Sequence, residues 1–309
     1  MVTGSRTSTL LALLAPVALI LAPACTTDEK KDDKKEEGKE ETKEPAQRDP
    51  STSLDKVAKG PDLSGPVPPE ISAVFFGVDG ALIPLACYDK DKKQLKANAN
   101  CLKLIDKSQE VFLKSEFSAE FDTIGEPKDA LCEAGGAVKP TSLATSKLDT
   151  GQAFDLGVWP KSAAQKLLFV GEDSTGDDAR KVDNDEKTAL REIVKAEGDI
   201  DITQVADLDI DGDGKSERFY SARVVNPKDT ARYLFSGLIM RSGADQKLTL
   251  IEETKTHLEV FSLRGAIDLD GDGTHELWVK AAFAEGGGER LYELKGGAAK
   301  AIGNWSCGL

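Results

Sequence analysis

The chain is poor in histidine, and its charge is strongly acidic. It has 2 His among 309 residues, so we expect no zinc site built from several histidines. Its net charge is −14, and because an acidic surface repels phosphate and attracts cations, we expect no nucleic-acid partner. Neither His257 nor His275 has a Ser or Cys pattern typical of a nucleophilic enzyme nearby. The residues Gly286-Gly287-Gly288 lack the Lys-Ser/Thr that completes a phosphate loop, so they are interpreted as a hairpin tip.

An apolar run lies near the N-terminus, after Arg6. Leu10 to Ala22 is interrupted only by Pro16. The run is shorter than the roughly 20 residues that a membrane-spanning helix needs, and it fits the apolar region of a signal peptide. We therefore predict a signal peptide over residues 1–24, with an N-terminal membrane helix as the alternative.

The residues Ala22-Pro23-Ala24-Cys25 permit two interpretations. Ala-x-Ala is a site for ordinary signal peptidase, which would release a soluble protein. A small residue directly before Cys also resembles the lipobox of bacterial lipoproteins, and that resemblance implies that Cys25 is lipidated. Lipidation is favoured because an even number of cysteines then remains, which suits two disulfides in an oxidising compartment. These are Cys87, Cys101, Cys132 and Cys307.

Thr26 follows Cys25, where an Asp is absent. By resemblance to the sorting pattern of Gram-negative lipoproteins, this implies an outer-membrane lipoprotein held by its lipid anchor. A soluble periplasmic or secreted protein is the alternative. Thr26 to Glu44 is almost entirely Lys, Asp and Glu, and Pro45 to Pro69 is rich in Pro, Ser, Gly and Asp. Such composition cannot bury a core, so residues 25–69 are predicted to be a disordered, extended tether.

Folded material is predicted from about residue 70, in a mainly β (α+β) body with one or two helices. Residues 70–150 are expected to form a small β-rich, disulfide-containing domain, beginning with two short strands over 73–85. Residues 151–309 are expected to form a second β-rich domain. Asn184 to Lys195 has the apolar spacing of a helix, capped by Asp183 or Asn184. Four cysteines allow three pairings; we prefer Cys87–Cys101 and Cys132–Cys307.

Two nine-residue loops carry the strongest pattern in the chain. Each has carboxylates at positions 1, 3, 5 and 9, and Gly214 or Gly273 at position 6 permits a sharp turn. Ca²⁺ needs six to eight oxygen ligands, and position 7 usually adds a main-chain carbonyl. The sequence therefore predicts two Ca²⁺ sites. The first has ligands Asp209, Asp211, Asp213, Lys215 and Glu217, and the second has Asp268, Asp270, Asp272, Thr274 and Glu276.

Position 12 distinguishes these loops from EF-hands. An EF-hand has a bidentate Glu there and continues as a helix. Here the position holds Tyr220 or Val279, and a strand-like alternation follows. A register starting at Asp207 would place Lys215 at position 9, so Asp207 is interpreted as a spare carboxylate. His275, at position 8, is expected to face solvent. Acidic turns without metal are the alternative, but repeated carboxylates repel one another and favour a cation.

The two loops are 268 − 209 = 59 residues apart, and Tyr233 and Tyr292 match at the same offset. Asp-x-Asp-x-Asp-Gly-x-x-Glu followed by a strand resembles the FG-GAP/VCBS-type calcium repeats of integrin-like proteins. The resemblance covers about 100 residues, from Val205 to Trp305. It implies that each loop binds Ca²⁺ and braces the turn between two strands. Two such units are too few to close a propeller, so we expect two repeated calcium-loop and strand units and not a complete propeller.

These features together favour a non-enzymatic, envelope-anchored lipoprotein that binds calcium and has a structural or adhesion role. Its protein or glycan partner is not identified by the sequence. The alternative is a secreted hydrolase with structural calcium and with catalytic carboxylates near Glu116, Glu120 and Asp122. A calcium sensor would need a bistable element, and the sequence shows none.

Overall fold

The computed structural model describes residues 73–78, 81–115, 118–128, 131–132, 136–137, 142–145, 156–284 and 286–307. The predicted signal peptide, Cys25 and the predicted tether lie outside these residues. The described part is mainly β, in agreement with the predicted class. All of it belongs to one compact unit.

The first sheet takes its strands from the N-terminal part of the described chain. Its seven strands are β1 (Ala73–Val78), β2 (Ala81–Asp89), β3 (Gln94–Ala97), β4 (Glu110–Lys114), β5 (Ala119–Lys128), β8 (Ser142–Thr145) and β9 (Leu156–Trp159). They are ordered β1-β9-β4-β5-β8-β2-β3, and β1 also pairs with β2, so the pairings connect six strands in a ring. The β1–β2 hairpin agrees with the two strands predicted over 73–85.

Strand pairing crosses the domain boundary predicted at residue 150. Strand β9 follows that boundary in the sequence, yet it pairs antiparallel with β1 and with β4. Its residues Leu156 and Val158 are buried in the same core as Ile83 and Leu85 of β2. The first sheet therefore draws on both predicted domains. A separate short pair is formed by β6 (Leu131–Cys132) and β7 (Gly136–Ala137).

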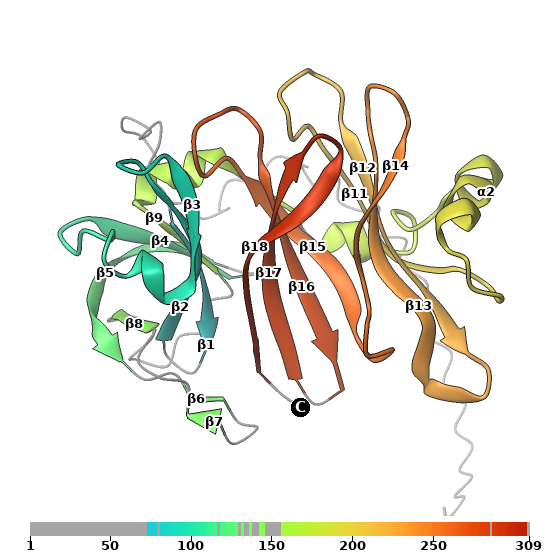
Figure 1. The fold of residues 1–309 in the computed structure, drawn as a ribbon, viewed down its shortest axis with the longest axis horizontal. Helices are drawn as coiled ribbons and strands as arrows, with labels where there is room; N and C mark the ends of the chain where they lie inside the picture. The colour runs from blue at the N-terminus through green and yellow to red at the C-terminus, as the bar shows by residue number, and fades with distance from the viewer. Residues whose placement is uncertain are drawn as a thin grey trace, which may run out of the picture. The chain divides into compact units, whose positions relative to one another are not determined.

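Two further antiparallel sheets follow, coloured from yellow to red in Figure 1. One is the meander β11 (Asp201–Leu208), β12 (Glu217–Asn226), β13 (Asp229–Arg241) and β14 (Leu248–Glu253). The other is β10 (Leu167–Phe169), β15 (Val260–Ile267), β16 (Glu276–Phe283), β17 (Gly286–Lys295) and β18 (Ala298–Cys307), in that order. Gly286 to Gly288 lie inside β17 and pair with β16 and β18. The prediction that they form the hairpin tip was wrong, because the pairing continues to Phe283 and Gly286.

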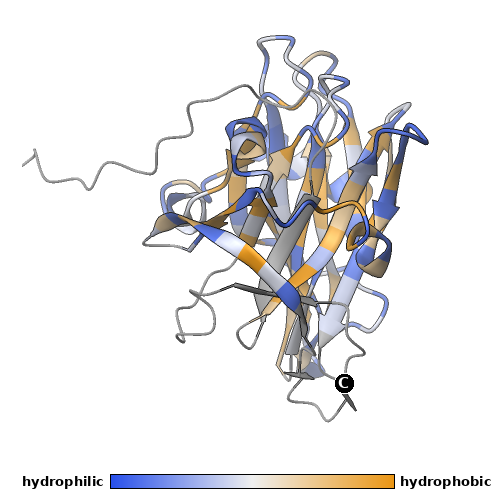
Figure 2. Cartoon of the chain, turned by 90° about the vertical axis from the view of Figure 1, so that its left-hand side faces the viewer, coloured by the Kyte–Doolittle hydropathy of each residue, from blue (hydrophilic) through white to orange (hydrophobic). Residues whose placement is uncertain are grey.

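The strands alternate their side chains between two cores, as a pleated strand requires. In β16, Leu277 and Val279 pack in a cluster that includes Phe219 of β12, whereas Trp278 packs in a cluster that includes Ile83 of β2. The β15–β18 sheet therefore has apolar side chains on both faces, one toward the first sheet and one toward the β11–β14 sheet. Figure 2 shows apolar and hydrophilic stretches within single strands.

In the described part of the chain, one α-helix and three short 3₁₀ segments accompany the strands. They are η1 (Asn98–Cys101), η2 (Lys161–Lys166), η3 (Glu172–Thr175) and α2 (Asn184–Ile193). Helix α2 begins where predicted, because the Asp183 carboxylate accepts from the N–H of Glu186 and the Glu186 carboxylate accepts from the N–H of Asp183. This capping box satisfies two end donors of the helix. Leu190 then packs against the β11–β14 sheet.

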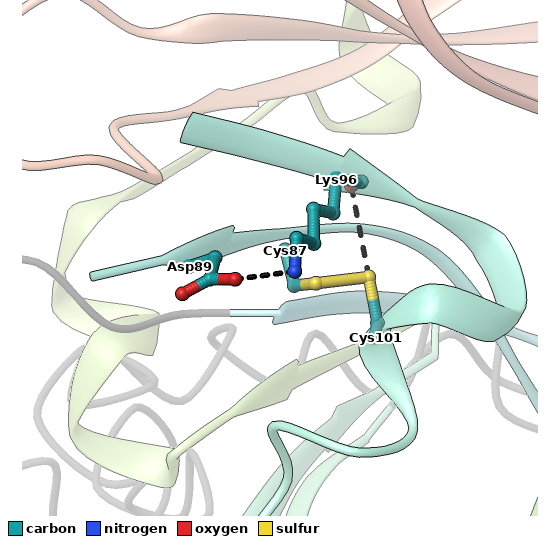
Figure 3. Close-up of a disulfide and its surroundings, with 4 residues drawn as sticks. All are labelled: Cys87, Asp89, Lys96 and Cys101. Carbon is teal, nitrogen blue, oxygen red and sulfur yellow. Dashed lines mark hydrogen bonds and ion pairs between the residues drawn. A yellow bond between two sulfur atoms is a disulfide. The ribbon is translucent and has the colours of Figure 1, made fainter. Parts of the chain in front are cut away.

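A disulfide joins Cys87 in β2 to Cys101 at the end of η1, as predicted (Figure 3). Both cysteines are buried in the apolar cluster of the first sheet. Asp89 and Lys96 form an ion pair across β2 and β3 next to this bond. The Lys96 hydrogen bond lowers the pKa of the Asp89 carboxyl below its ordinary value. The side chains of Cys132 and Cys307 are outside the described side chains, so the second predicted pair stays a prediction.

Candidate metal centre

Each aspartate loop connects the first two strands of a four-stranded meander. The first loop runs from β11 to β12 and the second from β15 to β16. In both cases the glutamate at position 9 is the first residue of the following strand, and it pairs with the last residue before the loop. Those closing pairs are Leu208 with Glu217 and Ile267 with Glu276. The loops are thus fixed at both ends by strand pairing.

The loop backbone curls around the side chain at position 1. In the first loop the Asp209 carboxylate accepts from the N–H groups of Gly212 and Gly214, at 2.8 and 3.0 Å. In the second loop Asp268 accepts from Gly271 at 2.6 Å. Gly214 and Gly273, at position 6, have φ of +82° and +92°. That left-handed backbone is the reason why glycine is needed there.

The structure brings together three carboxylates in each loop. Ligand atoms of Asp209, Asp211 and Glu217 lie within 4.8 Å of one another, and so do those of Asp268, Asp270 and Asp272. Ca²⁺ binds oxygens at about 2.3–2.6 Å, so two oxygens on opposite sides of the ion are about 5 Å apart. Both groups can therefore hold a metal ion of this size.

Two of the predicted carboxylate ligands stand outside these close groups. Asp213 accepts from the N–H of Lys215 at 2.8 Å, a bond that helps to shape the turn. Glu276 accepts from the N–H of Leu269 at 2.9 Å. In the second loop the corresponding turn bond runs from the N–H of Thr274 to Asp272. The residues at position 7 thus take part in shaping each loop.

The glutamate at position 9 is the most buried ligand of each loop. Glu217 and Glu276 are each 4 % exposed. Burial, together with the nearby Asp270 and Asp268 carboxylates, raises the pKa of Glu276 to about 8. Burial and Asp272 likewise raise the pKa of Asp270. A cation in the loop would supply the charge that these groups lack, since nearby positive charge favours the ionised carboxylate.

Two contacts near the loops were not predicted from the sequence, and the prediction for His275 was wrong. The N–H of Gly243, in the turn after β13, donates to Glu217 at 3.2 Å. The Lys166 ammonium lies 3.7 Å from an Asp268 oxygen. His275 was expected to face solvent, but it is only partly exposed and its ring contacts the carbonyl of Ile210. The sequence around these residues contains no pattern that predicts these contacts. Asp207, interpreted as a spare carboxylate, pairs with Arg218 at 2.9 Å and is not part of the close carboxylate group of the first loop.

Comparison with known proteins gives no match. No protein-family model matches the chain, and no match is found among curated proteins or solved structures. Within the described ranges, no helix has both the length and the apolar character to cross a membrane.

The remaining residues considered from the sequence are not part of the two carboxylate groups. Glu120 and Asp122 are two residues apart in β5 and so lie on one face of that strand. Glu116 lies outside the described residues. His257 has its ring Nδ1 at 2.9 Å from the carbonyl oxygen of Tyr233. Trp278 is fully buried and donates to Glu289, which is consistent with a core role.

Proposed function

We propose that this protein is a non-enzymatic, envelope-anchored lipoprotein whose β-rich body binds two Ca²⁺ ions and has a structural or adhesion role. The observation that carries the calcium part is the pair of carboxylate groups, each with ligand atoms within 4.8 Å, held in identically placed turns. Oxygen-rich, carboxylate ligand sets of this kind suit Ca²⁺. The body would then present its surface to a protein or glycan partner outside the membrane.

The charge balance of the loops supports a cation as part of the folded state. Four carboxylates occupy nine residues in each loop, and the one at position 9 is buried. Uncompensated carboxylates in such a place repel one another and resist ionisation. Lys166 is the cation that approaches Asp268, at 3.7 Å. A divalent ion would offset more of this charge, so its role is to stabilise the turns.

The equal spacing of the first two strands of each meander supports a second part of the proposal, that the meanders are copies of one calcium-loop unit. Strands β11 and β15 begin 260 − 201 = 59 residues apart, and β12 and β16 begin 276 − 217 = 59 residues apart. The loop offset is the same. Each copy would consist of four antiparallel strands with the ion at the first turn, as the FG-GAP/VCBS-like pattern implies.

The test is thermal unfolding of the full chain, with its disulfide intact, in millimolar Ca²⁺ and in excess EDTA. An ion at 100 times its Kd adds about 2.7 kcal/mol per site, which corresponds to a rise in Tm of about 5–10 °C for each site in a domain of this size. Ca²⁺ should restore the Tm after chelation, and Mg²⁺ should restore much less, because it demands a smaller octahedral site.

Two loop variants and one matched control give the test its specificity. Asp209→Asn and Asp268→Asn each remove one charge from a loop, and each should lose part of the Ca²⁺-dependent rise in Tm. Asp178→Asn removes the same charge from an exposed residue that pairs with Lys181, and it should keep the whole rise. An identical Tm in Ca²⁺ and in EDTA would show that the loops are turns without metal.

The anchoring part rests on Cys25 and is tested separately. Expression in a Gram-negative host with a labelled fatty acid should label the protein, and Cys25→Ser should abolish that label. Fractionation should then place the labelled protein in the outer membrane. If the wild type carries no label and is soluble in the periplasm, the lipoprotein proposal is wrong and the protein is a soluble exported one.

A further inference from the structure

The two aspartate loops contact each other directly. His275, at position 8 of the second loop, meets Ile210, at position 2 of the first. The backbone N–H of His275 donates to the Ile210 carbonyl at 2.8 Å, and the ring Nδ1 of His275 lies 2.9 Å from the same oxygen. Because a carbonyl only accepts, the Nδ1 atom carries the hydrogen. One carbonyl of the first loop therefore receives two donors from one residue of the second.

Both residues of this contact are flanked by ligands. Ile210 stands between Asp209 and Asp211, which belong to the carboxylate group of the first loop. The N–H of Ile210 donates to Glu217 at 3.1 Å. Glu217 therefore binds the N–H of Ile210, and His275 binds its carbonyl. Ile210 is 3 % exposed, and water cannot easily replace these partners.

The second loop has the matching internal bond. Leu269 is the counterpart of Ile210, and its N–H donates to Glu276 at 2.9 Å. His275 stands directly before Glu276 and directly after Thr274. Position 8 of the first loop is Ser216, so the histidine bridge runs in one direction, from the second loop to the first. An ion bound in the first loop would fix the position of Ile210, and an ion bound in the second loop would fix the position of His275.

We propose that the two loops bind Ca²⁺ with positive coupling, and that His275 carries this coupling to Ile210. The proposal rests on the calcium function proposed above. An ion in one loop orders its backbone, including its half of the bridge, so the second ion meets a loop that has less freedom left to lose. Linkage makes the effect reciprocal between the loops. Couplings of this type amount to about 5–150-fold in affinity, and a single contact places the expectation near 5-fold.

The experiment is a calorimetric titration of the metal-stripped full chain with Ca²⁺ alone. The wild type, Asp209→Asn and Asp268→Asn are compared, because each variant silences one loop. With coupling, the loop that remains in either variant binds about 5-fold more weakly than the same loop does when its neighbour is filled. The absence of any binding heat in the wild type would overturn the calcium function itself. Two independent sites of unchanged affinity would overturn the coupling and leave the calcium function standing.

Three histidine variants locate the coupling. His275→Ala keeps the backbone bond but removes the ring donor, so two binding events should remain while the coupling falls toward 1. His275→Asn carries an amide donor near the Nδ1 position and should restore the coupling. His257→Ala is the matched control, because that ring also meets a backbone carbonyl at 2.9 Å, on Tyr233. Wild-type coupling in His275→Ala, or equal loss in His257→Ala, would overturn the proposal.

Discussion

Gln204 in β11 is the residue whose loss should most clearly weaken the contact between the two sheets that carry the aspartate loops. Its side-chain amide bonds to Leu263 in β15 on both sides, accepting from the Leu263 N–H at 2.7 Å and donating to the Leu263 carbonyl at 2.9 Å. It is 6 % exposed. Strand β10 pairs with β15 only from Ile267 to Gly265. The glutamine therefore satisfies the Leu263 backbone on the edge of β15 where pairing with β10 has stopped, while β16 pairs with the other edge.

The cost of removing it follows from those bonds. Gln204→Ala leaves the N–H and the carbonyl of Leu263 buried without that partner, and each unsatisfied group costs about 1–3 kcal/mol. The hydroxyls of Ser174 and Ser221 lose a partner as well. We expect the free energy of unfolding to fall by about 3 kcal/mol or more, with a Tm lower by about 6–12 °C.

The assay is urea denaturation of the full chain in saturating Ca²⁺, followed by tryptophan fluorescence. Gln94→Ala is the matched control, because Gln94 is exposed in the edge strand β3 and surface changes usually stay within about 0.5 kcal/mol. If Gln204→Ala falls within that margin of Gln94→Ala, the amide bridge does not hold the sheets together. The reasoning about buried backbone groups would then be refuted.

Three more outcomes are expected. The double change of Cys87 and Cys101 to Ser should lower the free energy of unfolding by about 3 kcal/mol, as measured in urea. The disulfide closes a loop across a separation of 14 residues and so reduces the conformational entropy of the unfolded chain by about that amount. An unchanged midpoint would contradict this expectation. Lys96→Met should shift acid unfolding to higher pH. The folded protein lowers the pKa of Asp89, so the ionised carboxylate stabilises the fold at pH values above the ordinary Asp pKa, and this stability is lost as the pH falls through the pKa of Asp89 in the folded state. An identical acid midpoint would refute this expectation. Trp278→Phe removes the indole donor from one oxygen of the buried Glu289 carboxylate, while Arg264 keeps the other oxygen, and it should cost about 1–3 kcal/mol in the same urea assay; an unchanged midpoint would refute the expectation that this oxygen needs the indole donor.

Features that depend on neighbours in the sequence could be predicted from it. The ligand types of each aspartate loop lie within nine residues, so their spacing alone indicates the turn. The helix start needed only Asp183 and the apolar spacing after it. Cys87 and Cys101 lie 14 residues apart on either side of a hairpin, and the short separation favoured their pairing. In each case the physical cause acts within one element or one turn.

Features that depend on packing between elements could not be predicted. Leu263 is 59 residues from Gln204, and Ile210 is 65 residues from His275. Glutamine and histidine are ordinary on exposed strands and turns, so neither residue type signals a buried bridge. The pairing of β9 with β1 and β4 is another such case, since the polar stretch before β9 indicated a boundary. Only the approach of distant strands gives these residues their partners.

The hydrogen bonds of Gln204 and His275 explain how two sheets that meet through apolar side chains can hold the loops in one fixed arrangement. The cluster that joins β12, β13, β15 and β16 consists of apolar side chains, and such contacts tolerate sliding because they have little direction. Hydrogen bonds have direction, and a slip of one residue would leave buried groups unpaired. Gln204 fixes β11 against β15 within the strands, and His275 fixes the first loop against the second where the strands end. The buried Gln204 and the half-buried His275 therefore fix the relative position of the two carboxylate groups, and neither of them is a predicted ligand.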